Sequence, residues 1–230
     1  MKAFRAPLME LAEFETVQKK CKKEKGILQF AGCVNSQKTH MMYALGDGFD
    51  YKIIATSSEM KAKQIYEEYR FLDSNVYLYP AKDLLFYQAD LRGKYLLKQR
   101  MEVFQAMMEQ SNVTVITSLD GFMDALLPLQ VVEERIRMFK LGDTVDFEQL
   151  KKDMVFLGYE REEQISGPGQ FAVRGGILDI YSLTEEVPIR IELWGDEIDS
   201  IRTFDVESQR SIENLKEITI YPACDFPEEQ

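Results

Sequence analysis

Residues 32–39 have the spacing of a phosphate-binding loop but depart from it at one position. Their sequence, Gly-Cys-Val-Asn-Ser-Gln-Lys-Thr, has the length of the Walker A motif GxxxxGK[ST]. Gln37 stands where that motif has its second glycine, which lets backbone N–H groups wrap the phosphates. Lys38 and Thr39 remain in place. We therefore predict that Gly32, Gln37, Lys38 and Thr39 form a degenerate, inactive loop, with weak nucleotide or anion binding as the alternative.

The other parts of a nucleotide-hydrolysing site are hard to find in this sequence. A magnesium-binding carboxylate should follow a later strand, but Asp120 is displaced from the end of the strand expected at 113–117. His40 is the single histidine and is more typical of a helix surface than of a general base. The acids at 196–199 lie at a turn without an apolar pocket to raise a pKa. We predict no catalytic residue, no metal site and no cofactor.

A strand in the last quarter of the chain carries a different kind of chemistry, that of a surface for another protein. Alternation along 189–194 puts Arg190, Glu192 and Trp194 on the face opposite to the apolar residues. Arg174 joins them if its own strand is a neighbour. Tryptophan and arginine are enriched at binding hot spots, so the pattern favours docking. In the alternative, Trp194 tucks under a loop and the arginines pair with nearby carboxylates.

Asp179 is an acid whose role the pattern leaves open. It alternates with Leu178 and Ile180, so it faces away from them. It either pairs with an arginine and orients it, or caps the end of a strand. For the docking surface itself, we expect Arg190→Glu to abolish capture of the partner while the fold stays intact.

The elements that position the loop alternate between strands and helices. Residues 1–131 are predicted to contain four short strands, at 26–30, 51–56, 75–79 and 113–117. Amphipathic helical stretches separate these strands, an arrangement that forms βαβ units around a parallel sheet. The first domain, residues 1–131, is therefore predicted to be α/β.

Residues 132–230 are predicted to form a second domain, of the α+β class. An amphipathic helix is expected at 146–157. Closely spaced strands follow, at 170–173, 177–181, 189–194, 198–204 and 217–221. Connections this short require hairpins, since parallel crossovers need a dozen or more residues. The sheet should be antiparallel.

Charge is distributed unevenly between the two halves. Residues 1–131 carry 17 basic and 16 acidic side chains, whereas residues 132–230 carry 11 and 23, and the whole chain has a net charge of −11. Binding to phosphate backbones depends on lysine and arginine, so strong nucleic-acid binding is not expected. The step in charge suggests two modules of different character, although an acidic solubilising surface would explain it equally well.

Composition excludes several other classes. With 45% hydrophobic and 29% charged residues, the chain is typical of a globular protein. No run of about 18 apolar residues is present, so no membrane span is predicted. Three distant cysteines, Cys21, Cys33 and Cys224, do not indicate a disulfide framework or a zinc site. We expect a cytoplasmic protein.

Three blocks of the second domain, residues 169–181, 188–202 and 204–210, resemble a known family. They are similar to the N-terminal region of the bacterial transcription-repair coupling factors, the part that resembles the excision-repair protein UvrB. The likeness extends over nearly the whole chain and includes the degenerate loop. It implies a truncated RecA-like α/β domain of the P-loop type that does not bind ATP. An α+β domain resembling domain 2 of UvrB, the module that docks UvrA, would follow.

Carried over motif by motif, the resemblance implies that Arg174, Arg190 and Trp194 contact UvrA, and that Glu192 occupies an acidic position of the UvrB surface. The family often has phenylalanine where Trp194 stands. The chain would then recruit UvrA and couple stalled transcription to DNA repair without being an enzyme itself. The ATP-driven translocase motor and the polymerase-binding domain of the family are expected beyond residue 230.

Two alternatives to recruitment of UvrA stay open at this point. The chain could be a UvrB-type, nucleotide-binding part of a helicase. It could also be an intramolecular, autoinhibitory docking module, because the resemblance implies that a C-terminal domain of the full-length protein masks the same surface.

Overall fold

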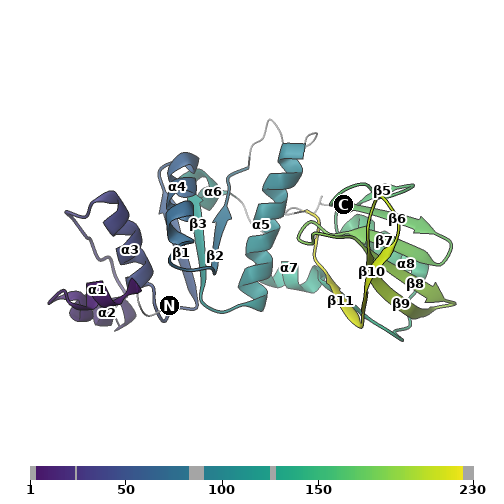
Figure 1. Cartoon of the computed structure of the whole chain (residues 1–230), viewed down its shortest axis with the longest axis horizontal. Coiled ribbons are helices and arrows are strands. Elements are labelled where there is room, and N and C mark those ends of the chain that lie inside the picture. Colours follow the sequence, from purple (N-terminus) through teal and green to yellow (C-terminus); the bar gives the residue numbers. More distant parts are fainter. Residues whose placement is uncertain (1–3, 24, 83–90, 125–127, 225–230) are drawn as a thin grey trace. The chain divides into compact units, whose positions relative to one another are not determined.

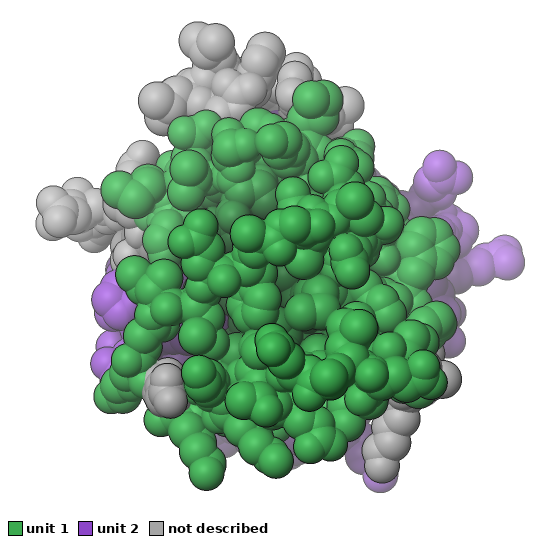
Figure 2. Space-filling model, turned by 90° about the vertical axis from the view of Figure 1, so that its left-hand side faces the viewer, with its two compact units in different colours: residues 1–81, 109–124 green, residues 82–108, 125–230 purple. Residues whose placement is uncertain are grey.

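The computed structural model describes residues 4–23, 25–82, 91–124 and 128–224. The chain divides into two compact units, residues 1–81 with 109–124, and residues 82–108 with 125–230 (Figure 2). Both units combine helices with strands (Figure 1), so the chain has the mixed α/β content predicted from its sequence. The domain boundary between residues 131 and 132 stays a prediction.

The first unit contains a parallel sheet, as predicted, built from three of the four predicted strands. β3 (Val113–Ser118) lies in the centre and pairs with β1 (Tyr51–Thr56) on one side and β2 (Val76–Tyr79) on the other. All six residues of β3 are buried. Its β-branched sequence, Val-Thr-Val-Ile-Thr-Ser, is typical of a central strand enclosed on both faces.

Two helices of the first unit begin after a serine that caps them. α4 (Glu59–Tyr69) starts after Ser58, whose hydroxyl accepts a hydrogen bond from the backbone N–H of Lys61. Its buried residue Tyr69 packs edge-on against the ring of Tyr43. The other helices of this unit are α1 (Ala6–Met9), α2 (Phe14–Lys23), α3 (Asn35–Leu45) and α6 (Leu119–Met123).

The strand predicted at residues 26–30 is absent from the structure, so that prediction was wrong. These residues pair with none of the three strands of the sheet. Ile27 is 99% exposed, and Leu28 and Phe30 are exposed as well. A short apolar run becomes a strand only where a neighbouring strand pairs with it, and this run has no such neighbour.

The second unit contains a six-stranded sheet with the order β10-β9-β8-β7-β6-β5. Its strands are β5 (Glu160–Glu162), β6 (Gln170–Arg174), β7 (Ile177–Tyr181), β8 (Ile189–Trp194), β9 (Glu197–Phe204) and β10 (Ser211–Leu215). The predicted hairpins are confirmed from β6 to β9, whereas β5 pairs with β6 in parallel. A separate antiparallel pair joins β4 (Arg137–Lys140) to β11 (Glu217–Ile220).

One face of the six-stranded sheet is apolar and forms the main core of the unit. The register aligns Leu178 with Ile191 and Ile180 with Ile189, and all four side chains are buried. α8 (Phe147–Phe156) begins after Asp146, whose carboxylate accepts two backbone N–H groups of its first turn. The remaining helices are α5 (Leu91–Glu109) and α7 (Leu129–Arg135).

Candidate functional site

The loop at residues 32–39 leads into α3, and two of its side chains are engaged in hydrogen bonds within the first unit. The side-chain oxygen of Gln37 accepts a hydrogen bond from the backbone N–H of Val34, over 3.4 Å. In a working loop, N–H groups at this helix start would be offered to phosphate oxygens. Gln37, which replaces the glycine, therefore also engages one of these donors, the N–H group of Val34.

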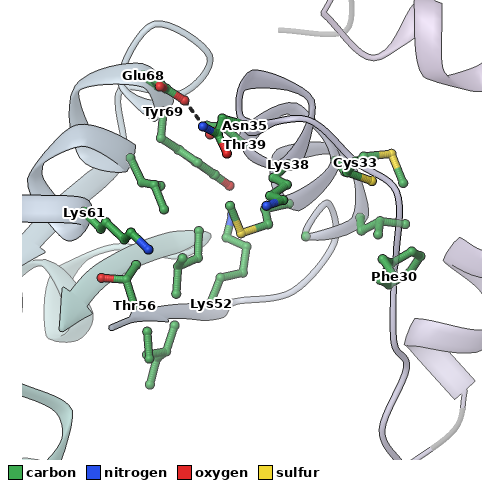
Figure 3. A pocket seen from close by; sticks show the side chains of 18 of the residues that line it. Phe30, Cys33, Asn35, Lys38, Thr39, Lys52, Thr56, Lys61, Glu68 and Tyr69 are labelled. Atoms are coloured by element: carbon green, nitrogen blue, oxygen red, sulfur yellow. Dashed lines mark hydrogen bonds between the residues drawn. The ribbon is translucent and has the colours of Figure 1, made fainter. Parts of the chain in front are cut away.

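Thr39 is also engaged within the protein. It is buried, and its hydroxyl donates to Glu68 Oε2 over 2.7 Å (Figure 3). Thr39 lines a cavity of about 830 Å³, and the exposed Lys38 lines it too, together with Lys52 and Lys61 (Figure 3). A hydroxyl in this motif position binds Mg²⁺ in a working loop, whereas here it is engaged by an internal hydrogen bond.

Lys52 is held by the protein as well. Its ammonium donates to Asn112 Oδ1 over 2.8 Å and lies 4.0 Å from a carboxylate oxygen of Asp73. Burial lowers the pKa of Lys52, and Asp73 partly opposes that effect. The cavity thus has apolar walls and three lysines in its lining. One of these lysines, Lys52, already interacts with Asn112 and Asp73.

The other face of the six-stranded sheet gathers the residues that alternation predicted to point away from the core. Strand register places Ala172, Asp179, Arg190 and Arg202 in one row across the sheet. The next row aligns the strands at Arg174, Ile177, Glu192 and Ser200. Trp194 follows at the end of β8, opposite Glu197. We call this surface the outer face and define it by Arg174, Asp179, Arg190, Glu192, Trp194 and Arg202.

Asp179 is the centre of the outer face. Its carboxylate is only 2% exposed and accepts hydrogen bonds from two arginines. Arg190 donates through Nε over 2.6 Å and through Nη2 over 2.8 Å, while Arg174 donates through Nη2 over 3.1 Å. A buried carboxylate needs such partners, because desolvation without them is costly. Of its two possible roles, Asp179 therefore pairs with arginines and orients them.

Arg190 is less accessible than its outward register suggested. Its side chain is only 12% exposed, and its guanidinium lies 4.3 Å from the centre of the Phe204 ring. The hydrogen bonds with Asp179 raise the pKa of Arg190. A glutamate at this position would face Asp179 in a largely buried place. We therefore revise the expectation that Arg190→Glu would leave the fold intact, and predict that this variant is destabilised.

Glu192 belongs to a second polar pair on the outer face. Arg202 Nη2 donates to Glu192 Oε1, and the hydroxyl of Ser200 donates to Glu192 Oε2 over 3.0 Å. Our sequence prediction did not include Arg202. The alternation of β9 could have found it, since Ile201 and Thr203 flank it as Ile189 and Ile191 flank Arg190.

Trp194 is the most exposed member of the outer face. It is 84% exposed, so the alternative in which it tucks under a loop is wrong. The other half of that alternative holds, because the arginines do pair with carboxylates. Gly195 follows at φ +64°, a conformation that glycine adopts readily and that suits a two-residue hairpin turn. The turn ends the strand beside Trp194 and leaves its side chain uncovered.

Comparison with known proteins finds relatives over most of the chain. The family described as the UvrB interaction domain matches residues 138–226, the segment that contains the outer face. The transcription-repair-coupling factor of Bacillus subtilis is 34% identical over 206 residues, 87% of this chain and 18% of the relative. That of Staphylococcus aureus is 36% identical over 158 residues, 68% of this chain and 13% of the relative. Over most of its length, this chain is similar to the transcription-repair-coupling factors, and it spans less than a fifth of the length of these relatives.

Within the described residues, no helix is both long and apolar enough to cross a membrane.

Predictions made from the sequence also overlooked Gln209, whose side-chain oxygen accepts a hydrogen bond from Arg190 Nη2 over 2.8 Å. It lies in the third of the blocks that resemble the transcription-repair coupling factors.

Proposed function

We propose that the outer face is the surface through which this chain binds the excision-repair protein UvrA, in a role that couples transcription to DNA repair. The observation that supports this most strongly is the exposure of Trp194 inside the segment matched by the UvrB interaction domain. Large aromatic side chains beside arginines are the usual anchors of protein interfaces. A tryptophan that gains nothing from the fold is well explained by a partner that covers it.

The arginines of the outer face could also orient a binding partner. The second half of the chain has an excess of 12 acidic side chains, yet Arg174, Arg190 and Arg202 gather on this one surface. Arg174 has a side chain 49% exposed and uses one nitrogen on Asp179, so its other nitrogens are available to a partner. Cationic groups within an acidic surface favour one orientation of a partner and disfavour others.

In this proposal the first unit supports the docking unit and does not process nucleotide. The hydrogen bonds of Gln37 and Thr39 support that assignment, because they engage two groups that a phosphate and its magnesium would need. We accordingly infer that this chain is not an enzyme on its own. Addition of ATP with Mg²⁺ should leave its melting temperature unchanged, whereas a UvrB-type nucleotide site would raise it.

The test of docking is a calorimetric titration of the chain with UvrA. Arg174→Ala removes an exposed guanidinium while Arg190 still pairs with Asp179, so we expect affinity to fall about tenfold without unfolding. Arg161→Ala, an equally exposed arginine on β5 outside the outer face, serves as the matched control and should bind as the wild type does.

Two results would count against the proposal. Equal affinity of the wild type and Arg174→Ala would show that UvrA binds elsewhere. Failure of the folded wild type to bind UvrA at all would favour the intramolecular alternative, in which the outer face contacts another part of a longer protein.

A further inference from the structure

The turn between β9 and β10 is held together by an unusual number of hydrogen bonds for an exposed segment. The Asp205 carboxylate accepts the backbone N–H and the hydroxyl of Ser208, over 2.8 and 2.6 Å. The backbone N–H of Asp205 donates to Arg210, and that of Gln209 donates to Asp205. The hydrogen bonds from Ser208 lower the pKa of Asp205. The turn is therefore closed by hydrogen bonds from both its backbone and its side chains.

Gln209 adopts a backbone conformation that is unfavourable for its residue type. Its φ is +59°, and Asn112 is the only other non-glycine residue with positive φ in the described part of the chain. Glycine or asparagine fits this left-handed region at lower cost. A glutamine that is kept under strain invites a functional explanation through its side chain.

Both ends of the Gln209 amide are bound, which fixes its orientation. Nε2 donates to the backbone oxygen of Val206 over 2.8 Å, and Oε1 accepts from Arg190 Nη2 over 2.8 Å. Together with the two bonds to Asp179 and the ring of Phe204, this contact restrains Arg190 from three sides. Within the described residues, the Nη1 group of Arg190 makes no hydrogen bond.

We propose that Gln209 is a positioning residue for the outer face. It holds the guanidinium of Arg190 against Asp179, so that Nη1 is the edge offered to a partner and Arg174 keeps its place on the same carboxylate. A side chain positioned in advance loses less conformational freedom on binding. The inference rests on the proposed function, since it assigns to the turn at 205–210 a part in binding UvrA.

Variants at residue 209 separate this role from a purely structural one. Gln209→Asn suits the left-handed backbone but is one methylene shorter, so its amide no longer reaches Arg190. Gln209→Glu keeps the full reach and an acceptor oxygen for Arg190 but loses the donor to Val206, so it isolates the contact with Arg190. Glu207→Gln changes an exposed side chain of the same turn and is the matched control. Each variant of the whole 230-residue chain is titrated with UvrA, and its melting temperature is measured. The Nε–H resonance of Arg190 is followed by NMR.

We expect Gln209→Asn to bind UvrA about tenfold more weakly, because the released Arg190 side chain must then be ordered on binding, with the melting temperature lowered by no more than about 4 °C. Its Arg190 Nε–H resonance should shift or broaden, whereas Glu207→Gln should keep wild-type affinity within about threefold and Gln209→Glu should bind UvrA more tightly than Gln209→Asn does. Wild-type affinity in Gln209→Asn would overturn the inference and leave the proposed function standing. Failure of the wild type itself to bind UvrA would overturn both.

Discussion

The degenerate loop of the first unit and the outer face of the second differ in how their polar groups are used. In the loop, Gln37 and Thr39 are bound to other groups of the same unit. On the outer face, Asp179 also binds its neighbours, but Arg174 and Trp194 remain exposed. Internal hydrogen bonds thus engage polar groups of both regions. The difference that our proposal uses is the side chain left exposed beside them, which on the outer face is a tryptophan next to an arginine.

Among the variants that test this comparison, Asp179→Ala is expected to change the free energy of unfolding the most. Removal of the carboxylate leaves Arg190 largely buried without its charge partner, and such a loss costs about 3–5 kcal/mol. Chemical denaturation should show this decrease in the free energy of unfolding. Asp199→Ala, an exposed acid on β9, should change it by less than about 0.5 kcal/mol. A stable Asp179→Ala variant would mean that the network does not organise the outer face.

A pH-dependent effect is expected in the first unit, at Tyr69. Burial raises the pKa of Tyr69 from 10.0 to about 12. The folded chain therefore keeps this proton when the unfolded chain has released it, so stability falls as pH rises from 10 toward 12. The loss approaches about 2 kcal/mol. Denaturation at pH 8 and pH 11.5 should show that wild type loses stability relative to Tyr69→Phe. A constant difference between the two proteins would contradict the buried environment of Tyr69.

A smaller effect is expected from Thr39→Val, which tests whether the loop is closed. The variant removes the hydrogen bond to Glu68 at nearly constant volume, so we expect a loss of about 1 kcal/mol in the free energy of unfolding. Lys38→Ala, at the neighbouring exposed position, should have no measurable effect. The opposite ranking, or an ATP-induced rise in melting temperature that Lys38→Ala removes, would indicate a working nucleotide site.

Local patterns predicted more of the second unit than of the first. A period of two was enough to assign Arg174, Arg190, Glu192 and Trp194 to one face, because the strands are joined by short hairpins. The burial of Arg190 was not predictable in this way. It depends on Phe204 and Gln209, which approach from a different strand and its turn. The strands β4, β5 and β10 are short or polar and gave no clear signal.

In the first unit, the predictions that failed were those that depended on tertiary pairing. The run at 26–30 has the composition of a strand, yet composition does not supply the neighbouring strand that it needs. Likewise, the spacing at 32–39 identified the loop, but its closure depends on Glu68, from a different helix. In both examples the local sequence identified the residues correctly but did not predict which other parts of the unit they contact.

The most direct test of the account is a calorimetric titration of UvrA with the wild-type chain and with Trp194→Ala. Because Trp194 is 84% exposed, its removal should leave the melting temperature unchanged. Loss of a central aromatic anchor is expected to weaken binding by about 2 kcal/mol or more, which is at least about thirtyfold in Kd. Equal Kd values for the two folded proteins would contradict the assignment of the outer face as the docking surface.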